Sequence, residues 1–271
     1  MKKFKNKVII ITGSSSGIGY GLAKFCLKLD MKVVMAARNI KPMQFLVKEG
    51  GYDESCFLIV STDVTEPGDC KSLIEQTVNK FERIDVLVNN AGISMRALFS
   101  ELEINVIKKL MEVNFWGAVY CTKYALPYLL ESKGSIVGVS SIAGYKGLPA
   151  RAGYSSSKFA LNGFLETIRI ENMKSGLHVL IACPGFTASS IRERALDAKG
   201  KTQGESPRDE NKMMDTPIVA KHIMRAVSKR KATLILTRQG KLLVWLNKFF
   251  PACVDKMVYN HMAKEPGSPF K

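Results

Sequence analysis

Residues 7 to 29 join a strand-like run, a glycine-rich turn and a helix-like run without interruption. Lys7 to Thr12 is apolar and β-branched, and Gly13-Ser14-Ser15-Ser16-Gly17-Ile18-Gly19 follows at once. Tyr20 to Leu29 then places its apolar residues at helical spacing. Glycine lets backbone amides approach a pyrophosphate at the positive end of a helix, so this order predicts a dinucleotide site. A tight turn without a ligand is the alternative, because a glycine pattern alone is weak evidence.

Strand-like and helix-like segments alternate along the rest of the chain. This rhythm predicts right-handed crossovers and a parallel sheet whose carboxyl ends gather ligands. The further strands are expected at residues 32–37, 56–61, 85–88, 135–141, 178–182 and 233–236, and helices at 66–83, 102–131, 152–175 and 216–228. No linker or repeat divides the 271 residues. We therefore expect one α/β domain, a three-layer, doubly wound, Rossmann-like parallel sheet of about seven strands. Residues 1–240 would form the dinucleotide-binding and catalytic domain, and residues 241–271 would be an amphipathic C-terminal extension of the same domain.

The end of the second expected strand indicates which dinucleotide is bound. An acidic residue there would bind the ribose 2′-hydroxyl and repel a 2′-phosphate. Ala37 followed by Arg38 and Asn39 removes that repulsion and offers a guanidinium, which favours NADPH over NADH. The alternative for Arg38 is a solvated loop cation.

Tyr154 and Lys158 are spaced as a proton-transfer pair on the expected helix 152–175. Residues four apart lie on one face of a helix, so the Lys158 ammonium should lie beside the Tyr154 hydroxyl and lower the pKa of that phenol. The pair Tyr20 and Lys24 has the same spacing, so spacing alone decides little. Tyr154 differs because Ser141 ends an apolar strand thirteen residues earlier. A surface tyrosine on an amphipathic helix is the alternative.

Several polar residues follow the expected strands or interrupt an apolar helix. Asp63, Asn90 and Ser141 all come at carboxyl ends of strands, where a parallel sheet gathers ligands. Asn114 lies in the apolar middle of the helix expected over 102–131, which suggests a contact to backbone or water. The alternative for Asn114 is a polar residue satisfied in the core.

Composition limits the classes of function. Six scattered cysteines without paired spacing indicate reduced thiols and neither a disulfide framework nor a metal site. The basic N-terminus leads directly into the first strand, so we expect no signal peptide and a cytoplasmic protein. The net charge is +16, and residues 199–271 hold 15 Lys/Arg against 6 Asp/Glu. No nucleic-acid-binding signature accompanies this charge, so we expect no nucleic-acid partner. The charge can be interpreted as a solvated surface, as a site for an acidic ligand or as a contact with an anionic membrane surface.

Two segments near the C-terminus invite separate interpretations. Residues 188–215 carry Arg192, Arg194, Lys199 and Lys201 with little apolar pattern, and we expect a mobile lid over the site. Residues 240–250 are strongly apolar but too short to span a bilayer. With the lysines nearby, residues 241–264 could lie at a membrane surface as a peripheral contact. The alternatives are packing against a partner subunit or covering the substrate pocket.

Four motifs stand in order: Thr12-Gly13-x3-Gly17-x-Gly19, Asn89-Asn90-Ala91-Gly92, Ser141 with Tyr154-x3-Lys158, and Pro184-Gly185. In these motifs the chain resembles the short-chain dehydrogenase/reductase family over about residues 5 to 240. The resemblance implies a seven-stranded Rossmann-like sheet, NADPH as cofactor, hydride transfer between a nicotinamide and a carbonyl or alcohol, and a homodimer or homotetramer.

The resemblance also assigns roles to residues. It makes Tyr154 the acid/base, Ser141 the group that polarises the substrate oxygen, Lys158 the modulator and a ribose ligand, and Asn114 the holder of a water. The implied cofactor contacts are Gly13, Ser15, Gly17, Ile18, Gly19, Arg38, Asn39, Asp63, Val64, Asn90, Ala91, Gly92, Tyr154, Lys158, Pro184, Gly185 and Thr187. Because the family often has its threonine further along, Ser189 could share or take the role of Thr187.

The candidate substrate residues are mostly apolar and suggest a lipophilic ketone. They are Ser141, Ile142, Tyr145, Leu148 and Phe186, with Met95 nearby. A reductase of carrier-bound 3-oxoacyl chains is a second enzyme hypothesis. A binding protein that senses NADP without turnover is a hypothesis of another class, and the four filled catalytic positions argue against it.

Overall fold

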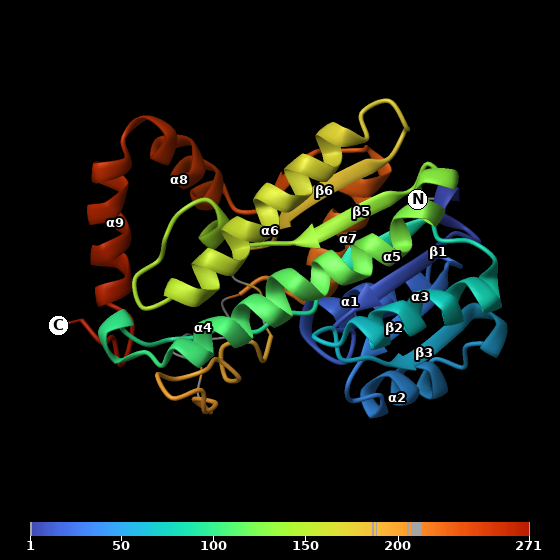
Figure 1. Cartoon of the computed structure of the whole chain (residues 1–271), viewed down its shortest axis with the longest axis horizontal. Helices are drawn as coiled ribbons and strands as arrows, with labels where there is room; N and C mark the ends of the chain where they lie inside the picture. Colours follow the sequence, from blue (N-terminus) through green and yellow to red (C-terminus); the bar gives the residue numbers. More distant parts are fainter. Residues whose placement is uncertain (1, 186, 188, 205, 207–212, 271) are drawn as a thin grey trace.

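The computed structural model describes residues 2–185, 187, 189–204, 206 and 213–270. Over these residues, seven strands form one parallel sheet in the order β3-β2-β1-β4-β5-β6-β7 (Figure 1). The strands are β1 (Val8–Thr12), β2 (Lys32–Ala37), β3 (Phe57–Ser61), β4 (Val86–Asn89), β5 (Ser135–Val139), β6 (His178–Cys183) and β7 (Thr233–Ile235). Each expected strand is present, with bounds shifted by two residues at most.

The middle of the sheet is buried on both faces. All five residues of β1 are buried, and Ile10 of β1 lies opposite Val34 of β2 and Leu87 of β4. Strands covered on both faces have near-continuous apolar sequences, because neither side of the pleat meets water. The same pattern in the sequence predicted these strands correctly.

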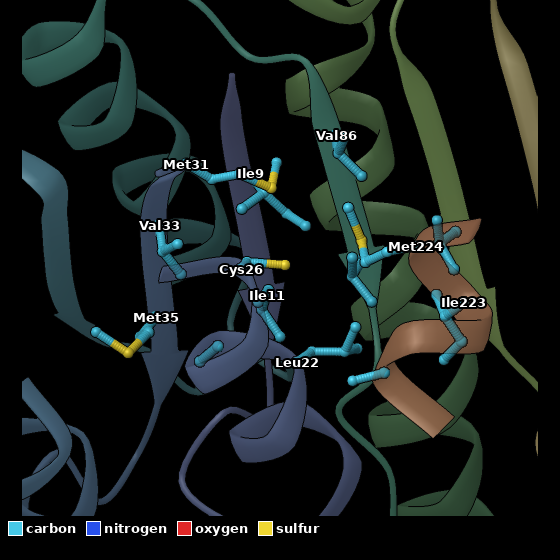
Figure 2. Close-up of a cluster of buried hydrophobic side chains, with 14 of the residues drawn as sticks. Ile9, Ile11, Leu22, Cys26, Met31, Val33, Met35, Val86, Ile223 and Met224 are labelled. Atoms are coloured by element: carbon cyan, nitrogen blue, oxygen red, sulfur yellow. The ribbon is translucent and has the colours of Figure 1, made fainter. Parts of the chain in front are cut away.

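Helices cover both faces of the sheet, which confirms one three-layer α/β domain. The α-helices are α1 (Gly17–Leu27), α2 (Lys41–Glu49), α3 (Pro67–Phe81), α4 (Ile104–Met111), α5 (Gly117–Glu131), α6 (Ala152–Glu171), α7 (Thr216–Ser228), α8 (Arg238–Phe249) and α9 (Pro251–Ala263). Side chains from α1, α2 and α7 form one core with the sheet, and those from α3, α5 and α6 form the other. Figure 2 shows part of the first core, with Leu22 and Cys26 of α1 near Ile11 of β1 and with Ile223 and Met224 of α7 on the β4 side.

The helix expected over residues 102–131 is not continuous. A π-helical segment, Glu112–Trp116, separates α4 from α5 and contains Asn114. A π-helical turn inserts an extra residue into a helix and is frequent at functional sites. The expected helix over 152–175 also ends earlier, at Glu171. Apolar periodicity predicted both helices and missed the π-helical segment in the first and the earlier end of the second.

The chain direction across the sheet changes at β1. The chain runs outward from β1 to β2 and β3, and then returns to the other side of β1 for β4 and β5. Loops after β1 and β4 therefore diverge, and the space outside the carboxyl ends of these strands is where open α/β sheets bind ligands. The glycine turn and the residues after β4 both lie at this edge.

Candidate active site

The glycine turn after β1 is shaped by the chain that follows β4. Gly13 has a φ of +65°, and a Cβ on it would lie 2.8 Å from the Cα of Ala91. A Cβ on Gly19 would lie 2.4 Å from the carbonyl oxygen of Gly13. Neither position can hold a side chain without moving backbone atoms. The turn thus presents bare backbone at the N-terminus of α1, as an anion site requires.

Thr12 and Asn90 clamp this turn to the end of β4. The Thr12 hydroxyl accepts bonds from the backbone N–H groups of Asn90 and Ala91, both at 3.0 Å. The Asn90 amide donates to the carbonyl oxygens of Thr12 at 2.8 Å and Gly13 at 3.2 Å. Asn90 was predicted as a cofactor residue, and its side chain here shapes the turn. The role of Thr12 as a clamp was not predicted, although its position at a strand end was a usable signal.

Arg38 and Asp63, at the ends of β2 and β3, lie close enough to form a loose ion pair. Their nearest nitrogen and oxygen are 3.7 Å apart, and the Arg38 side chain is 71% exposed. Asn39 accepts a hydrogen bond from the backbone of Lys41. Val64 is buried, and a Cβ on Gly117 would lie 2.7 Å from its side chain. The structure therefore gathers these four predicted residues at one edge of the sheet, on the β2–β3 side of the glycine turn.

Ser141 and Tyr154 meet where β5 ends and α6 begins. Ser141 follows β5, and its hydroxyl accepts a hydrogen bond from the backbone N–H of Ala143 at 3.2 Å. Tyr154, a partly exposed residue on the first turn of α6, has its phenol hydrogen-bonded to the Ser141 side chain. Helix α6 lies close to α4, since a Cβ on Gly153 would lie 3.1 Å from Leu110. The predicted serine–tyrosine pair is therefore brought together.

The pKa of Tyr154 lies above its ordinary value, contrary to the lowering that the sequence suggested. Burial of the phenol is the main cause; the hydrogen bond from Ser141 and the charges of Arg151 and Arg192 oppose it. The Lys158 ammonium is 5.8 Å from the centre of the Tyr154 ring and donates to the Val139 carbonyl oxygen at 2.9 Å. Helical spacing correctly made Lys158 a neighbour of Tyr154, but it carried no information about burial.

The pKa of Lys158 is itself shifted. Only 4% of it is exposed, and burial lowers the pKa of its ammonium from 10.5 to about 8. The Cys183 thiol lies near enough to act on it, and burial raises the pKa of that thiol to about 12. Lys158 therefore gains and loses its proton close to neutral pH.

Asn114 ties three elements together. Its side chain accepts from the backbone N–H of Ile93 at 2.8 Å and donates to the Ile93 carbonyl oxygen at 3.0 Å and to Ser157 of α6 at 2.9 Å. A Cβ on Gly92 would lie 3.1 Å from the Asn114 oxygen and 3.7 Å from the Lys158 nitrogen. The expected backbone contact is present. A role in holding water stays a prediction.

A second buried asparagine, Asn162, was missed. Its side chain accepts from the Ser140 hydroxyl at 2.6 Å and donates to the Gly144 carbonyl oxygen at 2.9 Å. These bonds fasten the 3-10 turn Ile142–Gly144 to α6 and so fix the chain on both sides of Ser141. The signal that singled out Asn114, an asparagine among apolar helical residues, was also present at Asn162.

The segment after β6 approaches the glycine turn. Gly185 has a φ of +77°, and the buried Thr187 hydroxyl donates to the Gly185 carbonyl oxygen at 3.4 Å. A Cβ on Gly17 would lie 3.0 Å from the Cβ of Ser189. The choice between Thr187 and Ser189 as the carboxamide ligand stays open, and the mobility expected of residues 188–215 stays a prediction.

The predicted substrate residues fall into separate apolar clusters. Tyr154 packs with Met95 and Leu196, whereas Ile142 and Tyr145 pack on the α3, α5 and α6 side of the sheet. The Tyr145 phenol is hydrogen-bonded to Thr233, and burial raises its pKa to about 12. Leu148 instead lines a cavity of about 680 Å³ beside α9. Phe186 lies outside the described residues, and substrate contact by Ser141, Ile142, Tyr145 and Leu148 stays a prediction.

Comparisons with known proteins agree with this geometry. A family model described as short chain dehydrogenase matches residues 7–200. A Dehydrogenase/reductase SDR family protein 7-like of Dictyostelium discoideum is 34% identical over 263 residues, covering 94% of this chain and 82% of the relative. An 11-beta-hydroxysteroid dehydrogenase A of Sesamum indicum is 31% identical over 272 residues, covering 98% and 78%.

A solved structure shares the fold. The short chain dehydrogenase/reductase of Burkholderia phymatum in complex with NAD matches with a TM-score of 0.82 at 22% identity, covering 93% of this chain and 96% of that one. At this identity the likeness concerns the fold alone.

Replacing Gly19 by alanine should weaken binding of a nicotinamide dinucleotide at least about tenfold, because the new Cβ would displace the Gly13 carbonyl and the Asn90 amide. Fluorescence titration of the purified variant measures the loss. Gly163→Ala is the matched control, since a Cβ there meets nothing within 4 Å. Unchanged binding by the Gly19 variant would show that this turn is not the nucleotide site.

The shifted lysine predicts a pH dependence of stability. Because the pKa of Lys158 is about 8 in the folded chain and 10.5 ordinarily, the unfolded chain binds more protons between these values. The contribution of Lys158 to the free energy of unfolding should therefore rise with pH across this window, by up to about 1.4 kcal/mol per pH unit.

Urea unfolding of the wild type and of Lys158→Met, at the two ends of the window, measures this contribution. The difference between the two proteins cancels the other titrating groups. A difference that stays constant with pH would contradict the lowered pKa.

Proposed function

The chain belongs to the short-chain dehydrogenase/reductase family, and from this premise we propose that it is a reductase that transfers hydride from NADPH to a lipophilic ketone. The reverse reaction would oxidise the secondary alcohol. The observation that carries the proposal is the Tyr154 phenol hydrogen-bonded to Ser141, with the Lys158 ammonium beside the same ring. An acid, a second donor and a cation thus converge at the carboxyl end of β5.

The residues at the sheet edge fit a nicotinamide dinucleotide. The positions of Gly13 and Gly19 leave a cradle that a Cβ would fill, and backbone can approach a pyrophosphate there. Asp63 and Val64 would flank the adenine, Asn90 and Gly92 would line the cofactor, Lys158 would reach a ribose, and Thr187 or Ser189 would hold the carboxamide. When bound, NADPH supplies the hydride from its nicotinamide.

Arg38 supports NADPH over NADH. It follows Ala37 at the end of β2, a position where no carboxylate repels a 2′-phosphate. Its guanidinium is largely exposed and held to Asp63 only at 3.7 Å, so it can turn towards a phosphate at little cost. A bidentate guanidinium is well suited to that phosphate.

The shifted pKa values favour reduction as the working direction. Because burial raises the pKa of Tyr154, the phenol carries its proton at neutral pH and can donate it to a developing alkoxide. Ser141 donates a second hydrogen bond to the same oxygen and stabilises its charge. Lys158, with a pKa of about 8, can release a proton near neutral pH and so help to reprotonate the phenolate.

The surroundings of Tyr154 support a lipophilic substrate. Its ring packs against an apolar cluster that contains Met95, Val106 and Leu196. The printed name of the Sesamum indicum relative also refers to a steroid, an apolar molecule. We place the enzyme in the cytoplasm or at a membrane surface that faces it, where a reduced NADPH pool would favour ketone reduction.

Exposed apolar side chains on α6 and the adjoining π segment support a homodimer or homotetramer. Trp116 is 40% exposed and stacks on Tyr120, while Phe159 and Ile170 of α6 are 46% and 63% exposed. Large exposed apolar groups on neighbouring helices are typical of subunit contacts.

Replacing Tyr154 by phenylalanine tests the proposed reaction. Loss of the proton donor should lower the rate of NADPH oxidation with a panel of ketones by roughly 10²- to 10⁴-fold while NADPH binding is kept. Tyr20→Phe is the control, because Tyr20 also has a lysine four residues later but packs against the core that α1, α2 and α7 form with the sheet. Full turnover by the Tyr154 variant would exclude Tyr154 as the acid.

Replacing Arg38 by alanine tests the choice of cofactor. NADPH affinity should fall about tenfold or more while NADH affinity changes little, because only NADPH carries the 2′-phosphate. Arg225→Ala, which removes an exposed cation from α7, controls for net charge. Equal losses for both cofactors would show that Arg38 does not contact the phosphate.

A further inference from the structure

Helix α8 is a surface helix with an unusually apolar outer side. Of its twelve residues only Gly240 is buried. Leu242, Trp245 and Phe249 are 54%, 56% and 62% exposed, and Phe250, directly after the helix, is 57% exposed. A folded chain gains nothing from exposing four such side chains together, so this surface points to a partner.

The exposed side chains form one stripe. Leu242, Trp245 and Phe249 are spaced by three and four residues, which places them on one face of the helix. The rings of Trp245 and Phe249 contact each other, with centres 5.4 Å apart. We call Leu242, Trp245, Phe249 and Phe250 the α8 stripe.

The stripe faces outward because the other side of the helix is occupied. Leu243 and Leu246 of α8 pack with Val254 and Val258 of α9 and with Leu148. Asn247 donates to the Tyr145 carbonyl oxygen at 3.1 Å. Lys146 forms an ion pair with Asp255 of α9 at 2.5 Å. The two helices are therefore fixed to the body, at the opposite end of the molecule from α2 and β3 (Figure 1).

The charged residues of α8 are all positive. Arg238, Lys241 and Lys248 are exposed, and residues 238–254 contain no Asp or Glu. Trp and Phe beside Lys and Arg on a short amphipathic helix are typical of helices that lie in the membrane interface. Within the described part of the chain, no helix has the length and apolarity needed to cross a membrane.

We propose that α8 lies flat on an anionic lipid surface, with the α8 stripe inserted among the lipids and Arg238, Lys241 and Lys248 on the headgroups. A second copy of the chain fits the same surface less well. A symmetric contact would bring these three cations against their own counterparts with no acid in the segment to pair with them. Anionic headgroups neutralise all three.

Vesicle flotation with the full-length protein tests the proposal. The wild type should float with vesicles containing about one part phosphatidylserine to two parts phosphatidylcholine at low salt, and bind pure phosphatidylcholine at least about tenfold more weakly. Raising the salt to about 0.5 M should release most of the bound protein, since the headgroup attraction is screened.

Two variants separate the apolar and charged contributions. Trp245→Ser/Phe249→Ser should lose binding to both lipid mixtures, and Lys241→Glu/Lys248→Glu should lose the preference for the anionic one. Phe45→Ser/Met173→Ser is the matched control, since these residues are 61% and 75% exposed elsewhere and should float like the wild type. Melting temperatures confirm that all variants are folded.

Three outcomes would overturn the proposal: no flotation of the wild type at low salt, equal binding to both lipid mixtures, or the same loss in the control variant. Light scattering tests whether a second copy of the chain occupies the α8 stripe instead of lipid. If Trp245→Ser/Phe249→Ser dissociates an oligomer in the absence of lipid, a second copy covers the stripe. Because flotation measures binding, its result is independent of whether the protein reduces ketones.

Discussion

Buried backbone groups at the carboxyl ends of the parallel strands must find hydrogen-bond partners, because each unpaired group costs free energy. In this protein, side chains supply those partners. Thr12 and Asn90 join the ends of β1 and β4, Asn114 binds the backbone of Ile93, and Asn162 binds that of Gly144. The same bonds set the shape of the glycine turn and the positions of Ser141 and α6. The geometry of the site therefore follows from the side-chain hydrogen bonds that pair the backbone groups at this end of the sheet.

Burial of this region also explains both pKa shifts at the reacting groups. Moving a phenol and an ammonium out of water disfavours the charged form of each, so the pKa of Tyr154 rises and that of Lys158 falls. The phenol is kept protonated, while the ammonium is brought close to its titration point at neutral pH. A single physical cause thus shifts both groups in the directions that the proposed proton donation requires.

The sequence was sufficient to predict the sheet and the proximity of Lys158 to Tyr154, because strand burial and helical spacing are local patterns. The roles assigned to the site residues stay predictions. The sequence was insufficient wherever the burial or the hydrogen-bond partner of a side chain depends on residues that are distant in the sequence. The predicted direction of the Tyr154 pKa shift was wrong for that reason, and the hydrogen bond between Tyr145 and Thr233 of β7 was not foreseen. Helix α2 was missed since only Met43, Leu46 and Val47 mark its buried face. Asn162 could have been found by the reasoning that found Asn114.

Helices α8 and α9 show how tertiary structure resolves a sequence pattern that allowed several interpretations. Residues 240–250 form an apolar run in the sequence, and the run alone does not distinguish a buried side of the helix from an exposed one. In the structure, Leu243 and Leu246 cover α9, and the α8 stripe is left outward. Asn247 of α8 and Asp255 of α9 bind Tyr145 and Lys146, which lie in the segment between Ser141 and Tyr154. The helices that present the α8 stripe are therefore fastened by two polar contacts to the segment between Ser141 and Tyr154.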